Sequence, residues 1–279
     1  MTIKQFNDYV SSSNLFSIQN GIWYSSNSPI LSYPENGNDD CFELEDKSYW
    51  FHHRNNCLVS VVKRYSPSSL FFDVGGGNGI VTKAFENAYI PCVLIEPGKQ
   101  GVLNAKKRNL KNIFCGSLSD LKGLTGQINS IGAFDVIEHI KDDNKFIEEI
   151  NGMLKSGGAL FVTVPAFQFL WSHEDTDAGH FRRYNKKKII KLLENNGFDI
   201  VYSSYFFCAL LLPLYLIRTL PSKLNLRNKT KIRTQNEHNA NRGFVGKLLE
   251  SIWEWELRQI KQNKSIPFGT SCLVVAIKK

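Results

Sequence analysis

The sequence predicts an α/β fold, a doubly wound and mostly parallel sheet with helices on both faces. Short apolar segments that predict strands alternate with helical segments between residues 70 and 205, and this alternation implies parallel strands joined by right-handed crossovers. The first strand runs into a glycine-rich turn, Asp73-Val74-Gly75-Gly76-Gly77-Asn78-Gly79. The composition, 42% hydrophobic and 22% charged over 279 residues, excludes the disordered and fibrous classes.

The region before the first strand is expected to form an N-terminal cap and lead-in helix over residues 1–66. Residues 11–46 are rich in Ser, Asn, Gly and Pro, which predicts an ordered loop region or cap. Apolar residues recur at helical spacing from Tyr49 to Tyr65, and Pro67 ends that pattern.

The core of the fold is expected over residues 67–205, with the closing strand in residues 265–279. The apolar segments predict strands at Leu70–Val74, Cys92–Ile95, Asn112–Cys115, Ile131–Ile137, Ala159–Val164, Phe198–Tyr205 and Ser271–Ile277. Helices are expected between them. In one helix Phe146, Ile150 and Leu154 share a face, and another, Lys186–Asn196, ends at Gly197.

Residues 206–264 are expected to form an insertion with an apolar and a basic part. The uncharged stretch Tyr205–Ile217 contains Pro213 and is shorter than the roughly 20 residues that span a bilayer. Val245–Ile260 has helical spacing. Residues 218–247 contain a single acidic residue, Glu237. Their basic residues are Arg218, Lys223, Arg227, Lys229, Lys231, Arg233, Arg242 and Lys247. The stretch is either an interface with an anionic membrane or a buried hairpin followed by a solvated basic tail.

Charge and cysteine usage limit the partners and the compartment. The formal charge of +8 favours acidic partners without choosing among them, and because no nucleic-acid module is recognisable we expect no nucleic-acid partner. The six cysteines form no C-x-x-C pair, which argues for free thiols in a reducing compartment and against a zinc site. Met1–Val10 has no continuous apolar core, so we expect no secretory signal and a cytoplasmic location.

The glycine turn can bind a ligand or can simply make a tight connection between strand and helix. Glycine permits positive φ and lets a ligand approach the main chain. A dinucleotide fingerprint starting at Gly75 would need a glycine at Ile80, and the turn lacks the Gly-Lys-Ser/Thr of a phosphate-binding loop. Asp73 would repel a pyrophosphate. Glu96 ends the second strand, roughly 20 residues beyond the turn, where a carboxylate can accept hydrogen bonds from a ribose diol. Together these residues favour a nucleoside with a positive or neutral tail.

Several motifs together resemble one family. They are DVGGGNG at 73–79, LIEPG at 94–98, FDVIEHI at 134–140, MLKSGGALFVTVPA at 153–166, GHFRRY at 179–184 and PFGTSCLVVAIKK at 267–279. Residues 70–205 resemble class I S-adenosylmethionine-dependent methyltransferases, in particular the broad bacterial group that acts on small or glycosylated acceptors. The resemblance implies a Rossmann-like sheet of seven strands, the last of them antiparallel, and S-adenosyl-L-methionine as the cofactor.

The resemblance also implies which residues bind that cofactor. Asp73, Gly75 and Gly77, in the turn that ends at Gly79, would lie under the methionine part, and Glu96 would hold the ribose. Ser117 and Leu118 would lie beside the adenine. Many relatives have an aspartate at the position of Ser117. The pocket near the sulfonium would be lined by Asp135, Val136 and Ile137, as far as His139.

Candidate catalytic residues follow from the chemistry. Methyl transfer is an in-line displacement that mainly needs alignment, and a hydroxyl acceptor must also lose a proton. His139 and His180 are the candidate bases. The alternative for His139 is structural support of the cofactor pocket, and the alternative for His180 is a local hydrogen bond at a helix entry.

Candidate acceptor-binding residues lie in the segment after the fifth strand. Arg182 and Arg183 could clamp a phosphate or carboxylate, or one of them pairs with an aspartate, Asp175 or Asp177. Trp171 and Tyr184 could form aromatic walls or pack in the core. A further set combines histidines with carboxylates in one loop; since such loops are usually solvated, we expect no metal at His173, Asp175, Asp177 and His180.

The sequence thus predicts an S-adenosylmethionine-dependent methyltransferase. The expected acceptor is a hydroxyl or amine of a small molecule, a sugar or a lipid-linked glycan. If the insertion forms a membrane interface, we also expect peripheral contact with an anionic membrane. The alternative is a catalytically inactive protein of the same fold that acts as a cofactor-binding regulator or partner subunit. The intact DVGGGNG and EPG motifs argue against that alternative.

Overall fold

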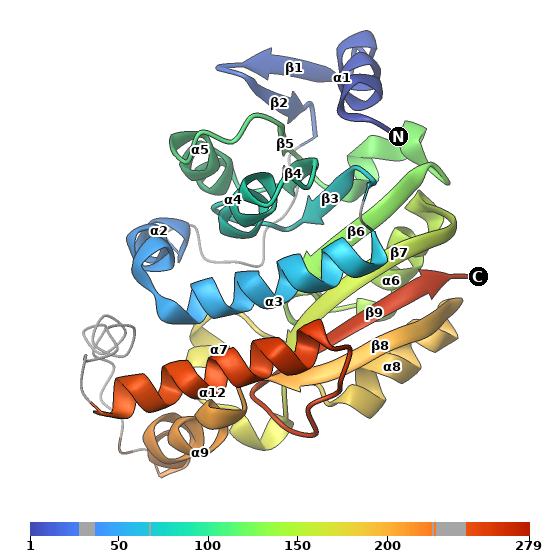
Figure 1. Cartoon of the computed structure of the whole chain (residues 1–279). Coiled ribbons are helices and arrows are strands. Elements are labelled where there is room, and N and C mark those ends of the chain that lie inside the picture. Colours follow the sequence, from blue (N-terminus) through green and yellow to red (C-terminus); the bar gives the residue numbers. More distant parts are fainter. Residues whose placement is uncertain (28–36, 67, 225, 227–243) are drawn as a thin grey trace.

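The fold is built on a single nine-stranded sheet with helices on both faces (Figure 1). The structure, a computed structural model, describes the whole chain except residues 28–36, 67, 225 and 227–243. The strand order is β1-β2-β5-β4-β3-β6-β7-β9-β8. The strands are β1 (Phe16–Gln19), β2 (Ile22–Ser25), β3 (Phe71–Val74), β4 (Cys92–Glu96), β5 (Ile113–Cys115), β6 (Ile128–Phe134), β7 (Leu154–Pro165), β8 (Phe198–Phe206) and β9 (Ser271–Lys278). The predicted doubly wound sheet is confirmed, including its antiparallel last strand, which pairs with both β7 and β8.

The predicted number of seven strands is wrong, because the N-terminal region adds a hairpin to the edge of the sheet. The region 11–46, expected as a loop or cap, instead contains the β1–β2 hairpin and most of α2 (Gly37–Lys47), and α1 (Ile3–Ser12) precedes the hairpin. Asn20 and Gly21 form the hairpin turn with φ of 51° and 73°, the pair of residues that tolerates such a turn best. β2 then pairs in parallel with β5.

Both faces of the central strands are buried, as a parallel sheet between helical layers requires. On one face Phe71 and Phe161 pack under α3 (Tyr49–Tyr65), α4 (Ile80–Asn87) and α12 (Phe244–Lys261). On the other face Phe72 and Val162 pack on α6 (Asp143–Met153) and α8 (Lys186–Asn195). The lead-in helix predicted at 49–65 is α3, which Ser48 caps by accepting a hydrogen bond from the Trp50 amide.

Two predicted boundaries shift where the backbone changes direction. β6 ends at Phe134 instead of Ile137, because Asp135 has a φ of 56° and a short 3-10 turn, η2 (Ile137–His139), follows it. Leu154, expected on the buried face of α6, begins β7 instead, and Met153 takes that place in the core.

The remaining elements frame the carboxyl ends of the strands. They are α5 (Lys99–Lys107), η1 (Leu118–Leu124), η3 (Gln168–Leu170), α7 (His173–Asp177), η4 (Cys208–Leu210), α9 (Leu211–Leu214), the π-helix η5 (Tyr215–Thr219) and α10 (Leu220–Lys223). In Figure 1, α2, α7 and α9 lie at the end of the sheet opposite the C-terminus.

The apolar insertion forms a chain of short helices, so the interpretation as a buried hairpin is wrong. Pro213 fits in the first turn of α9, where a backbone N–H would have no helical partner in any case. Most of the basic residues and Glu237 fall in 227–243 and lie outside the described residues. Among the helices that the structure describes, none is long and apolar enough to cross a membrane.

Candidate active site

A cavity of about 1810 Å³ opens at the carboxyl ends of β3, β4 and β6. Its floor is the glycine turn, and helices α2, α3, α9 and α12 contribute to its walls. Ligands of open α/β sheets bind at this edge. The cavity therefore lies where the sequence predicted the cofactor.

The glycine turn leaves its backbone open to the cavity. Gly75, Gly77 and Gly79 have φ of 70°, 54° and 75°, which L side chains rarely adopt. A Cβ on Gly75 would lie 2.8 Å from Cγ2 of Val136. The turn therefore requires glycine both for its conformation and for the close approach of Val136, which itself lines the cavity.

Asp73 presents an unsatisfied carboxylate oxygen beside this turn. Its Oδ2 accepts a hydrogen bond of 2.6 Å from the Thr82 hydroxyl, while the buried Oδ1 has no hydrogen-bond partner among the described residues. Burial raises the pKa of Asp73 to about 6. Because an unpartnered buried acceptor is costly, this oxygen fits a ligand ammonium such as that of a methionine moiety.

Glu96 joins the glycine turn to the turn after β4. Its carboxylate accepts hydrogen bonds from the Gly77 amide at 2.8 Å and the Gly98 amide at 2.6 Å. Burial raises the pKa of Glu96 to about 7. Two amide donors leave free lone pairs on the carboxylate, which can accept the hydroxyls of a ribose.

Helix α2 lies beside the glycine turn and α5, in a region that the sequence predicted only as loop or cap. The Glu45 carboxylate accepts a hydrogen bond of 3.2 Å from the side-chain amide of Asn78 in the glycine turn, and it pairs with Arg108 at 2.8 Å. Asp39 accepts hydrogen bonds from Gln100 and Asn104 on α5 at 2.8 Å and 3.0 Å. These contacts hold α2 against α5 and the glycine turn.

Asp135 also lines the cavity. The next residue, Val136, meets the glycine turn at Gly75, and His139 follows in η2. We call the part of the cavity at the glycine turn and Glu96 its first half and the part at His139 and His180 its second half.

Asp135 follows β6 with a positive φ, and its carboxylate pairs with Arg54 of α3 at 2.6 Å. Strained backbone at a cavity wall is common at functional sites. Arg54 was not among the predicted site residues; the signal for it was a polar run, His53-Arg54-Asn55, inside a helix that is otherwise apolar on its buried face.

The second half of the cavity contains two histidines in contact. The rings of His139 and His180 lie edge to face, with centroids 4.7 Å apart. Burial, and then the charge of His180, lowers the pKa of His139 to about 4, so its imidazole is neutral at pH 7. The Phe181 amide donates a hydrogen bond of 2.8 Å to the Glu138 carbonyl, which fixes the His180 segment against η2.

Asp175 orients His180 from behind. Its carboxylate accepts a hydrogen bond from His180 Nδ1 at 2.9 Å, two from Arg183 at 2.7 Å and 3.0 Å, and one from the Ser172 amide at 2.9 Å. Burial opposes ionisation, but the bonds from His180 and Arg183 outweigh it and lower the pKa of Asp175. The pairing of an arginine with Asp175 was one of the two alternatives for the GHFRRY segment.

The cavity brings together part of the predicted set. Its lining includes Asp73, Gly75, Gly77, Glu96, Asp135, Val136, His139, His180 and Arg183. The lining does not include Gly79, Ser117, Leu118, Ile137, Trp171, Arg182 or Tyr184. Tyr184 packs in the core with its hydroxyl 2.7 Å from Asp143, which also pairs with Arg182 at 2.7 Å. Ser117 lies at the start of η1, where it forms a capping box with Asp120.

The cavity wall also contains residues that carried no motif. These residues are Tyr24, Leu103, Cys115, Trp50, Leu210, Pro213, Leu214, Ile217, Leu249 and Trp253. Trp50 stacks on Phe207 with centroids 4.9 Å apart. The lining of the cavity thus combines apolar and aromatic side chains with the two imidazoles of His139 and His180.

Comparisons with known proteins point to one family. The model of a family described as methyltransferase domain matches residues 50–203, more than half of the chain. A Mycolicibacterium smegmatis protein named as a probable S-adenosylmethionine-dependent methyltransferase is 23% identical over 160 residues, which cover 56% of this chain and 62% of that protein. The chain thus spans less than two thirds of this relative.

Solved structures share the fold. A Haemonchus contortus phosphoethanolamine N-methyltransferase, solved with phosphomonomethylethanolamine and S-adenosylhomocysteine, aligns with a TM-score of 0.54 at 14% identity, covering 88% of this chain and 58% of that one. An Archaeoglobus fulgidus S-adenosylmethionine-dependent methyltransferase aligns with a TM-score of 0.50 at 13% identity, covering 82% of this chain and 100% of that one.

Proposed function

The chain belongs to the methyltransferase domain family, and we propose that it transfers a methyl group from S-adenosylmethionine to an acceptor held in the second half of the cavity. The observation that carries this proposal is the pair formed by Glu96 and the unpartnered Oδ1 of Asp73 on either side of the glycine turn. One carboxylate suits a ribose diol and the other suits an ammonium. The cofactor would supply an electrophilic methyl carbon.

The protein's own residues perform alignment and exclusion of water. Asp73 and Glu96 fix the two ends of the donor, Gly75 and Gly77 allow it to approach the backbone, and α2 shields it. Alignment of this kind supplies much of the rate enhancement in a displacement reaction. Asp135 marks the border with the acceptor region, where the nucleophile must lie in line with the methyl group.

The acceptor region suits a hydroxyl or amine on a molecule with an apolar part, such as a small molecule, a sugar or a lipid-linked glycan. His139 and His180 line the cavity, and in this proposal they act on the acceptor's proton. Arg183 also lines this region but is already paired with Asp175. Leu214, Ile217 and Trp253 offer apolar contact in the same cavity.

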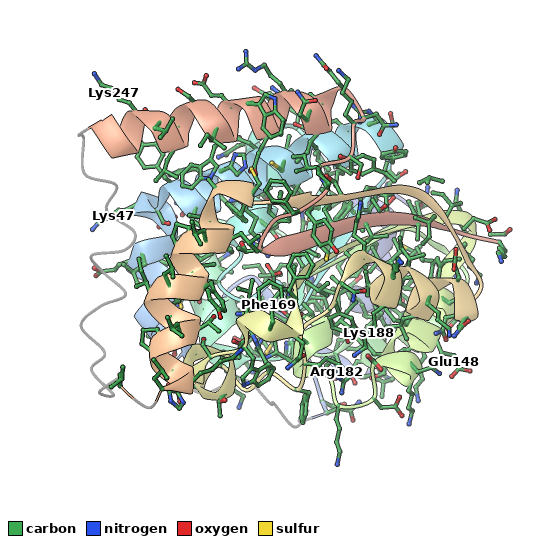
Figure 2. All side chains as sticks on the ribbon, turned by 90° about the horizontal axis from the view of Figure 1, so that it is seen from below. Lys47, Glu148, Phe169, Arg182, Lys188 and Lys247 are labelled. Atoms are coloured by element: carbon green, nitrogen blue, oxygen red, sulfur yellow. The ribbon has the colours of Figure 1, made fainter. Side chains whose placement is uncertain are left out.

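The apolar segment also supports peripheral contact with an anionic membrane. Its exposed apolar side chains, which we call the leucine face, are Leu212, Leu216, Ile217, Leu220, Leu224 and Leu226. The cationic residues Arg218 and Lys223 lie among them in the sequence. Figure 2 places Lys47 and Lys247 on the same side of the molecule as these helices, away from Glu148 and Lys188. Apolar side chains among cations favour an interface with anionic lipid, and Ile217 belongs to both the leucine face and the cavity wall.

The test of the proposed function is the transfer of labelled methyl groups. The purified protein and S-adenosylmethionine with a labelled methyl group are added to metabolite and glycan fractions from a strain lacking the gene, in which the acceptor accumulates one methylene lighter than the product. We expect one labelled product. Donor binding without transfer to any fraction would instead support the cofactor-binding regulator.

A further inference from the structure

Three side chains in the acceptor half of the cavity bring metal-ligating atoms together. Glu138, His139 and His180 each offer one such atom, and these atoms all lie within 4.8 Å of one another. Imidazole nitrogens and carboxylate oxygens bind first-row divalent ions at about 2.0–2.2 Å, so the ligands of one ion stand roughly 3–4 Å apart. Small side-chain rotations therefore bring all three to one ion.

The backbone holds these ligands in fixed positions. Glu138 and His139 are adjacent in η2. His180 lies on the segment after α7, and the hydrogen bond from the Phe181 amide to the Glu138 carbonyl ties that segment to η2. Two short segments joined in this way present their ligands on one side of the cavity, as a preorganised site requires.

Asp175 fixes which nitrogen His180 presents. The Oδ1 of Asp175 lies 2.9 Å from Nδ1 of His180, and because a carboxylate paired with Arg183 accepts hydrogen bonds, Nδ1 carries the proton. The Nε2 lone pair of His180 then faces away from Asp175. A carboxylate behind a histidine is the outer-sphere arrangement that orients most metal-binding imidazoles, and Arg183 and Ser172 hold Asp175 in place in turn.

Glu138 supplies an observation that is independent of the histidines. The residue is 1% exposed, and its buried Oε2 has no hydrogen-bond partner among the described residues. A buried carboxyl oxygen without a donor is costly, and a bound cation would satisfy it. Asp135 adds a second carboxylate nearby, although Arg54 already pairs with it.

We propose that Glu138, His139 and His180 bind one divalent transition-metal ion of the zinc, manganese or cobalt class, which leaves open positions toward the acceptor. Two imidazoles and one carboxylate are a ligand set with room for a substrate oxygen. An ion there would lower the pKa of a bound hydroxyl, whose proton leaves to solvent, and would orient the oxygen. The two imidazoles would then act on the acceptor's proton through the ion and not as bases, and the site favours an acceptor with a hydroxyl over one with an amine. The ion's role in catalysis rests on the proposed function, whereas its binding does not. This ligand set shares only His180 with the group His173, Asp175, Asp177 and His180, at which the sequence predicts no metal.

Cobalt(II) is a suitable probe, because its visible absorption reports nitrogen and oxygen ligands directly. Chelator-treated full-length protein is titrated with Co²⁺ alone, and then with Zn²⁺ in competition. We expect one ion per chain. Loss of a ligand in Glu138→Ala, His139→Asn or His180→Ala should weaken binding at least about 100-fold, and the outer-sphere change Asp175→Asn should weaken it about 10- to 100-fold.

His173→Ala is the matched control, because it removes an exposed imidazole on the adjacent α7 and should leave the affinity unchanged. Calorimetry with S-adenosylhomocysteine on the same variants reports folding and an intact donor site. Absence of Co²⁺ binding by the wild type at millimolar concentration overturns the proposal, as do equal affinities in all variants. If Co²⁺ binds but S-adenosylhomocysteine does not, the metal site stands and the proposed function fails.

Discussion

The backbone amide of Gly77 donates a hydrogen bond of 2.8 Å to the carboxylate of Glu96. This bond joins the turns that follow two neighbouring strands, β3 and β4, which pair in parallel along their length. It places the backbone of the glycine turn beside a carboxylate that can accept hydroxyl groups. In the proposed donor site the two turns therefore act as one unit, and changes at either residue should affect the same ligand.

Replacement of Glu96 tests that unit. In Glu96→Gln the site loses its charged acceptor, and since a hydrogen bond to a charged group contributes about 1.5–3 kcal/mol, affinity for S-adenosylhomocysteine should fall about 10- to 100-fold. Isothermal titration calorimetry measures the change. Glu194→Gln, at an exposed position on α8, is the matched control and should bind like the wild type. Equal affinity in both variants would remove Glu96 from the site.

The pH dependence of donor binding should follow Glu96. Burial raises its pKa to about 7 from 4.5, and the ionised form accepts both hydroxyls. Affinity for S-adenosylhomocysteine should therefore fall as the pH drops below 7, with a limiting slope of about tenfold per unit. Glu96→Gln should flatten this profile between pH 6 and pH 8, as calorimetry in buffers of that range can show. A wild-type profile without slope would contradict the prediction.

The raised pKa of Glu96 also determines how the stability of the unliganded protein changes with pH. The folded protein holds the Glu96 proton more tightly than the unfolded chain does, so the unliganded protein should lose stability as the pH rises from 4.5 to about 7. Thermal unfolding of the wild type and of Glu96→Gln across that range measures the difference. The variant should lose less stability than the wild type over the same interval.

The conformation of the glycine turn is tested by a pair of glycine variants. Gly75→Ala should abolish donor binding, because its φ is 70° and its new Cβ would meet Val136 at 2.8 Å. Gly152 lies in α6 without a positive φ, and a Cβ added there would meet no atom of the described residues within 4 Å. Gly152→Ala should therefore bind normally and gain about 0.5–1 kcal/mol of stability. Thermal unfolding and calorimetry on both variants give these results; normal donor binding by Gly75→Ala would show that the turn is not the donor site.

Contact with a membrane is tested on the leucine face. The wild type should float with vesicles that contain anionic phosphatidylglycerol and should remain in solution with neutral phosphatidylcholine. Leu212→Ser combined with Leu216→Ser should abolish flotation, because both side chains are at least half exposed, at 65% and 50%. Leu15→Ser with Ile18→Ser, at exposed positions of 62% and 56% on the N-terminal hairpin, is the control. A wild type that ignores anionic vesicles rules out the contact.

The sequence was sufficient for the features that depend on local patterns. Apolar segments predicted β3, β4, β5 and β9 to within about one residue at each end, because a strand buried on both faces needs an unbroken apolar stretch. The β1–β2 hairpin was missed although its Asn20-Gly21 turn is a strong hairpin signal. Its short strands lie within a polar region, which suggested a loop.

The site was only partly predictable, because its second half is assembled by contacts across the chain. Asp73 and Glu96 follow from strand ends, whereas Arg54 reaches Asp135 from a helix that precedes the first strand of the predicted core. The GHFRRY segment illustrates the limit most clearly. His180 and Arg183 face the cavity while Arg182 and Tyr184 turn to Asp143, and only the fold determines which neighbours point which way.

Calorimetric titration of the full chain with S-adenosylhomocysteine tests the central claim most directly. The donor site formed by Asp73, the glycine turn and Glu96 predicts saturable binding of one ligand per chain, and weaker binding when Glu96 is replaced by Gln. The absence of any binding heat at millimolar ligand, in a protein shown to be folded by circular dichroism, would contradict the assignment of this cavity to a methyl donor.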